Sequence, residues 1–150
     1  VHHGNGTQAV FWDEPRAAFF STHQENIYPF HTGFLDDAPH ARGRIVNLPL
    51  PARSGDDSFA RIAGQVLAPL VKRFAPQMLF VSAGFDAHRE DDLGQMGLVE
   101  ADYEWITRLI KGVADRHAKG RIVSCLEGGY NLEQLPRCVA AHLKALRCDG

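Results

Sequence analysis

The sequence has few cysteines, no long apolar run and no excess of positive charge, and each shortage excludes a class of protein. Its cysteines are odd in number and lack the paired spacing of a structural zinc site: Cys125, Cys138 and Cys148. We expect them to be reduced, which favours a cytoplasmic location, and Cys125 to lie in the core. No run of ~18 apolar residues occurs, so no membrane span is expected. The formal net charge of −2 gives no basis for direct nucleic-acid binding.

What the sequence does contain is an alternation of strand and helix patterns within 150 residues, enough for one domain with a core. Short apolar runs predict strands at 17–22, 45–50, 78–83 and 121–126. Helical periodicity predicts helices at 57–74, 100–118 and 132–146. Such alternation is typical of an α/β fold, with a parallel sheet flanked by helices.

Local signals refine this pattern. Asp57 and Ser58 are expected to cap the first long helix, which Pro69 should kink. Residues 2–7 are expected to form a glycine loop, and 23–39 a long polar and aromatic loop. Pro49 places its strand near an edge of the sheet, because proline cannot donate to a strand ladder.

The most informative stretch is 82–88, where an apolar run leads directly into Gly84, Phe85 and Asp86. Asp86 is therefore predicted just past the carboxyl end of a buried strand, where open α/β sheets bind their ligands. A buried carboxylate is costly unless a metal or a cation neutralises it. The acidic residues at 90–92 are interpreted instead as a solvated turn.

Two other polar side chains lie in glycine-rich segments, and each has a structural alternative. His2 is a candidate metal ligand with Asp86, although most single histidines are surface or satisfied core residues, the interpretation adopted for His40, His117 and His142. Tyr130 follows two glycines and could donate a hydrogen bond to a polarised carbonyl. A core tyrosine whose hydroxyl reaches solvent would give the same local pattern.

Three segments in one order, 2–8, 82–88 and 126–132, resemble the histone deacetylase family, specifically its class II-like and bacterial members. The resemblance covers essentially the whole chain. It implies the arginase/deacetylase α/β fold and a catalytic zinc held by an Asp-x-His motif and a second Asp. Here the histidine is His2 and the second aspartate is Asp86. The first aspartate would directly precede Val1, and the family's tandem histidines, which act as base, would lie further upstream. Residues 1–150 are therefore expected to be the carboxy-terminal portion of one catalytic domain.

The same resemblance assigns the remaining site residues. Tyr130 matches the tyrosine that polarises the amide carbonyl. The walls of the acyl-lysine tunnel match Phe30, Leu93, Gly128 and Gly129. A structural potassium ion, bound by many members, would use the His2 carbonyl, Ser21 and the Thr22 carbonyl.

The sequence departs from the family pattern in three places. The loop at 29–33 is shorter than usual, which leaves the tunnel rim and substrate choice open. Asp92 stands where many members have proline, and Val99 where a threonine normally caps the next helix.

The resemblance implies zinc-dependent removal of an acetyl group from acetyl-lysine, in histones or other proteins. Rival substrates are acetylpolyamines and other small acetylated amines. A noncatalytic acyl-lysine-binding remnant is a third reading, and the isolated chain is expected to be inactive. No membrane partner is expected, and the oligomeric state stays open.

Overall fold

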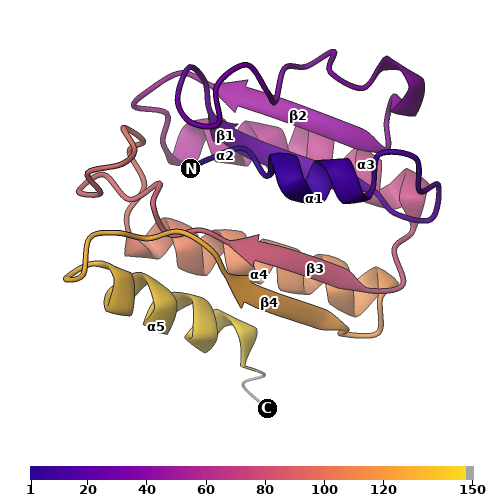
Figure 1. Cartoon of the computed structure of the whole chain (residues 1–150). Coiled ribbons are helices and arrows are strands. Elements are labelled where there is room, and N and C mark those ends of the chain that lie inside the picture. Colours follow the sequence, from indigo (N-terminus) through magenta and orange to yellow (C-terminus); the bar gives the residue numbers. More distant parts are fainter. Residues whose placement is uncertain (148–150) are drawn as a thin grey trace.

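The computed structural model describes residues 1–147. The chain folds into parallel strands flanked by helices (Figure 1). Strand β1 (Phe19–Gln24) pairs in parallel with β2 (Ile45–Leu50), and β3 (Leu79–Ala83) pairs in parallel with β4 (Ile122–Leu126). All four arrowheads point to the same side, where the N-terminus and the loops after β3 and β4 also lie (Figure 1). The predicted α/β class is therefore confirmed, although the strands of residues 1–147 form two separate two-stranded sheets in place of one, and all four end on this side.

Helices connect and cover these strands, and α2, α3 and α4 lie behind them in Figure 1. Their bounds are α1 Asn5–Val10, η1 Pro39–Ala41 (3₁₀), α2 Asp56–Ile62, η2 Ala63–Leu67 (π), α3 Ala68–Phe74, α4 Glu100–His117 and α5 Leu135–Leu146. Within residues 1–147, no helix is long and apolar enough to cross a membrane.

Two local expectations about these helices were wrong. The first long helix begins after Gly55 with no side-chain cap, so Asp57 is part of the first turn, where a negative charge is favourable. The predicted glycine loop at 2–7 is helical from Asn5, because the Gly4 carbonyl accepts a bond from the Gln8 amide at 2.9 Å.

The irregularity expected from Pro69 appears as the π segment η2, directly before the α3 turn that contains this proline.

The main core supports the loop that follows β3. Phe85, Leu98, Tyr103 and Cys138 are buried together between this loop, α4 and α5. The Tyr103 hydroxyl donates to the Phe85 carbonyl at 3.0 Å, and burial raises the pKa of Tyr103 well above its usual range. The hydroxyl is therefore a permanent donor that fixes the backbone one residue before Asp86.

His142 joins three elements behind this core. Its Nδ1 lies 2.7 Å from the Thr107 hydroxyl of α4, and its Nε2 lies 2.8 Å from the Ser124 hydroxyl of β4. Burial lowers the pKa of His142, so the ring is neutral at neutral pH. The interpretation of His142 as a satisfied core histidine agrees with these bonds.

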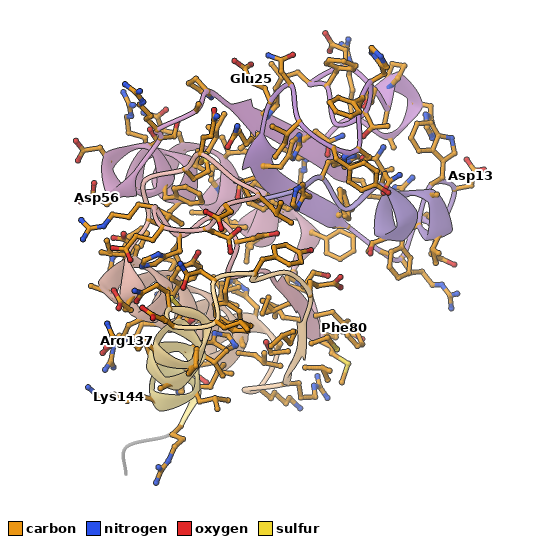
Figure 2. The ribbon with its side chains drawn as sticks, turned by 60° about the vertical axis from the view of Figure 1, so that its left-hand side comes forward. Asp13, Glu25, Asp56, Phe80, Arg137 and Lys144 are labelled. Atoms are coloured by element: carbon orange, nitrogen blue, oxygen red, sulfur yellow. The ribbon has the colours of Figure 1, made fainter. Side chains whose placement is uncertain are left out.

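The β3–β4 pair has one covered face and one open face. Val81 packs into the main core, whereas Phe80 is 74% exposed, because successive strand residues point to opposite faces. Figure 2 shows Phe80 on the opposite side of the molecule from Arg137 and Lys144 of α5. The expectation of a strand buried on both faces was wrong for residues 78–83.

The two described cysteines also differ in exposure to solvent. Cys138 is buried on α5, and burial raises the pKa of its thiol to about 11. Cys125 lies in β4 but is exposed, so its predicted place in the core was wrong. Both are free thiols, and Cys148 lies outside the described residues.

One guanidinium group ties the turn after α1 to the start of β2. Arg44 donates to the carbonyls of Phe11 at 2.8 Å, Trp12 at 2.7 Å and Glu14 at 2.9 Å, and to that of Ala17 at 3.3 Å. The side chain thus satisfies several carbonyls of a loop that has no strand partner of its own.

Arg44→Ala is expected to lower the free energy of unfolding by about 2–3 kcal/mol, because bonds to a charged donor are among the stronger ones. Denaturant unfolding of the complete protein would measure the loss. Arg42→Ala is the matched control, since Arg42 is 80% exposed and meets Asp36 only at 4.0 Å. Equal losses in the two variants would contradict this role for Arg44.

Candidate active site

Asp86 lies at the shared edge of the strands, in the turn that follows β3. Its side chain is 3% exposed, and the predicted burial is confirmed. The turn is held by the Phe85 amide, which donates to the Gly128 carbonyl at 2.8 Å, and by the Tyr103 hydroxyl. A buried carboxylate in so constrained a turn needs positive partners.

His2 and the backbone nitrogen of Val1 lie against this carboxylate. His2 Nδ1 lies 2.9 Å from Asp86 Oδ2, and the Val1 nitrogen contacts Asp86 Oδ1. The Val1 carbonyl accepts a bond from the Gln24 amide at 2.9 Å, at the end of β1. Residues 1 and 2 therefore lie between the carboxyl ends of β1 and β3, and the sequence correctly paired His2 with Asp86.

Two tyrosine rings stand beside His2. The Tyr130 ring centroid lies 6.5 Å from that of His2, and the Tyr28 centroid lies 6.2 Å from it, both edge to face. Tyr130 is half exposed. Three candidate groups thus come together: a buried carboxylate, an imidazole and a phenol.

The two glycines before Tyr130 have separate structural reasons. A Cβ on Gly128 would collide with the Asp86 carboxylate, so only glycine lets the β4 loop approach the aspartate this closely. Gly129 has φ +140°, a backbone conformation that residues other than glycine rarely adopt. The loop therefore brings Tyr130 to the site through close backbone contact.

The predicted tunnel residues lie around this edge with large exposed surfaces. Leu93 is 54% and Phe30 is 65% exposed. Leu93 also lines a hollow of about 380 Å³ together with Gln24, Glu25 and neighbouring residues. The roles of Phe30, Leu93 and the two glycines as tunnel walls stay predictions.

Ser21 and Thr22 lie on β1, whose last residue, Gln24, donates a bond to the Val1 carbonyl. His23 Nε2 donates to the Gly33 carbonyl at 3.0 Å, and burial lowers the pKa of His23 to about 4. The neutral ring therefore accepts at Nδ1 from the Ser21 hydroxyl, 2.9 Å away. This bond uses the Ser21 proton and leaves its oxygen free to accept, as a potassium ligand would need.

The residues present fit part of a zinc site. Imidazole nitrogen and carboxylate oxygen are ordinary zinc ligands, and His2 and Asp86 present one of each at a buried point. Within residues 1–147, no group of three or more His, Cys, Asp or Glu side chains is placed to hold a metal ion. A third ligand would therefore have to come from elsewhere, and a residue bonded to the Val1 nitrogen would lie beside Asp86.

Sequence reasoning missed two residues that lie next to the candidate groups. Tyr28 adjoins His2, and its only sequence signal is its place before Pro29 in an aromatic loop. Asp91 had been interpreted as solvated with its two neighbours, but its carboxylate is buried and accepts bonds from the backbone of Tyr130 and Asn131. Glu90 and Asp92 are exposed as expected.

Comparison with known proteins gives one consistent result. A profile of the histone deacetylase domain matches residues 1–146. Histone deacetylase 14, chloroplastic, of Arabidopsis thaliana is 42% identical over 148 residues, which is 97% of this chain and 35% of the relative. The histone deacetylase-like amidohydrolase of Pseudomonas aeruginosa is 36% identical over 97% of this chain and 39% of the relative. The chain thus spans little more than a third of the length of these relatives.

The solved structures agree with the sequence comparison. The crystal structure of an acetylpolyamine aminohydrolase from Burkholderia pseudomallei superposes with a TM-score of 0.84 at 30% identity, covering 97% of this chain and 42% of that chain. The parallel strands and flanking helices are accordingly those of the arginase/deacetylase fold. On the combined match of profile, relatives and structure, this chain belongs to the histone deacetylase family.

Proposed function

We propose that the complete protein is a zinc-dependent amidohydrolase that removes the acetyl group from acetyl-lysine. The observation that carries this proposal is that His2, paired with the buried Asp86, meets the half-exposed Tyr130 at one end of the strands. These three residues occupy the positions that the family resemblance assigns to two metal ligands and an oxyanion donor.

In this proposal His2 and Asp86 hold the zinc ion together with an aspartate bonded to the Val1 nitrogen. The bound ion would polarise the amide carbonyl and lower the pKa of a water molecule. Burial of Asp86 keeps its carboxylate oriented by His2 and by the Phe85 turn, so the ligand needs little reorganisation. The general base would be the tandem histidines that the resemblance places upstream.

Tyr130 acts on the other side of the substrate carbonyl. Its hydroxyl would donate to the carbonyl oxygen, and the bond would strengthen as that oxygen gains negative charge. The half-exposed ring stands on a loop that close glycine contacts hold against Asp86. Attack of the water on the carbonyl carbon, with its proton taken up by the base, would form the new C–O bond. Cleavage of the C–N bond, with that proton passed from the base to the leaving amine, would yield lysine and acetate.

A structural potassium ion is part of the same proposal. The Ser21 oxygen, whose proton is committed to His23, and the carbonyls of His2 and Thr22 would bind it. Such an ion would fix the backbone between β1 and His2, and so the imidazole itself.

Small acetylated amines are the second candidate substrate class. The structural match to an acetylpolyamine aminohydrolase favours them, and the short loop at 29–33 leaves the rim open to a different ligand. An acyl-lysine-binding protein without hydrolysis is the third candidate.

The test is the kcat/KM of the complete, zinc-loaded protein for an acetyl-lysine peptide and for acetylputrescine. We expect hydrolysis of the peptide, loss of activity with a chelator and recovery when zinc is restored. Preference for acetylputrescine would move the assignment to the small amines. Tight peptide binding without acetate release would favour the noncatalytic candidate.

A further inference from the structure

Asp91 is a buried carboxylate with three backbone partners from two loops. Its Oδ2 accepts from the Tyr130 amide at 2.7 Å and from the Asn131 amide at 3.1 Å. Its Oδ1 accepts from the Leu93 amide at 3.0 Å. Asp91 is 5% exposed, so these charge-assisted bonds form away from bulk water, where they are strong.

The two loops joined here carry two residues of the proposed site. Tyr130 and Leu93 are each about half exposed, so core packing does little to place their side chains. The positions of these side chains therefore depend on the backbone, and the Asp91 carboxylate binds the backbone amides of both residues. One side chain therefore sets the spacing between the proposed oxyanion donor and the proposed tunnel wall.

A second set of bonds extends the same junction. The Asn131 side chain donates to the Glu90 carbonyl at 2.7 Å, and its oxygen accepts from the Glu133 and Gln134 amides at 3.1 Å each. Gln134 in turn donates to the Glu90 carboxylate at 2.9 Å. These exposed or partly buried bonds align the two loops, whereas the buried Asp91 is the point at which both are fixed.

We propose that Asp91 is a positioning residue that holds the Tyr130 hydroxyl and Leu93 in catalytic register. This inference rests on the proposed function of Tyr130, but its structural half is independent of activity. Its effect on kcat acts through Tyr130, so its removal should lower kcat only while the Tyr130 hydroxyl is present, whereas a displaced Leu93 should change KM.

Asp91→Asn is the informative change, because the amide keeps the shape but replaces one acceptor oxygen by a donor. Either the Tyr130–Asn131 pair or Leu93 must then face an N–H group. We expect kcat on the acetylated substrate to fall about 10- to 100-fold, since small misplacements of a catalytic group have effects of this size. Asp92→Asn is the matched control, as it removes the same charge from an exposed neighbour and should leave kcat unchanged.

A double-mutant cycle with Tyr130→Phe distinguishes positioning from general damage. Once the hydroxyl is gone, Asp91→Asn should lower the remaining kcat by less than about 3-fold. Full additivity of the two changes would overturn the proposal. If Asp91→Asn does not fold, Asp91→Glu takes its place, because it keeps the charge but displaces the carboxylate. The same double-mutant cycle with Tyr130→Phe is then measured.

Amide hydrogen exchange gives a readout that needs no activity. In the complete protein, exchange at the amides of Leu93, Tyr130 and Asn131 should be slow. In Asp91→Asn, but not in Asp92→Asn, it should accelerate at least about 10-fold at the amides that then face the N–H group, which are either Leu93 or the Tyr130–Asn131 pair. Unchanged exchange at these amides would overturn the proposal. An inactive wild-type protein would instead refute the proposed function, and the exchange result would still decide whether Asp91 fixes the two loops.

Discussion

Tyr130→Phe in the complete protein is expected to lower kcat on an acetyl-lysine peptide about 10²–10³-fold, the usual effect of losing one oxyanion donor. The centroid of the Tyr130 ring lies 6.5 Å from that of His2, and the residue is half exposed. The bond strengthens only as charge develops, so KM should change little. Steady-state kinetics and zinc analysis on the same preparation would measure both.

Tyr28→Phe is the matched control for this change. It also removes a phenol hydroxyl beside His2, 6.2 Å from the imidazole, but on a residue that the proposal does not use for catalysis. We expect kcat within about 3-fold of the wild type for this control. A Tyr130→Phe enzyme with full zinc and near-normal kcat would remove Tyr130 from the mechanism.

Asp86→Ala and His2→Ala are each expected to abolish zinc binding and activity together. A zinc site with a protein ligand removed has too few donors to hold the ion tightly. We expect zinc content to fall from about one equivalent to below about 0.1, and kcat to fall at least about 10³-fold. Elemental analysis and steady-state kinetics would measure these losses.

Asp92→Ala serves as the control here, since Asp92 lies in the same loop but is exposed. Its zinc content and kcat should match the wild type. Because Asp86 is buried beside its partners, thermal melting should accompany the assay, so that unfolding is separated from metal loss. Full zinc content in a folded Asp86→Ala or His2→Ala protein would refute the assignment.

The part of the site that follows strand ends could be predicted from the sequence. An apolar run ending in glycine placed Asp86 correctly, and the glycines before Tyr130 indicated a close approach that the structure traces to the Asp86 carboxylate. The end of a strand can be predicted from the local sequence, and the carboxyl ends of parallel strands lie on the same side. The convergence of His2, Asp86 and Tyr130 followed from this rule and from the family motifs.

The rest depends on contacts between distant segments. Asp91 and Asp92 are chemically identical neighbours, and only the position of the 130–131 backbone makes one buried and the other exposed. Tyr28 becomes a neighbour of His2 through the fold of a long loop with no periodic pattern. The exposure of Phe80 likewise depends on which face of the strands the helices cover.

The open face of the β3–β4 pair has a practical consequence for work with shortened forms of this protein. Phe80 and its strand partner Val123 are exposed there, next to strands that pair with one neighbour each among residues 1–147. Unpaired strand edges and exposed apolar side chains are templates for edge-to-edge association between copies. A polypeptide limited to these residues is therefore expected to aggregate at the concentrations used for purification, and its inactivity alone would not test the roles of His2, Asp86 and Tyr130.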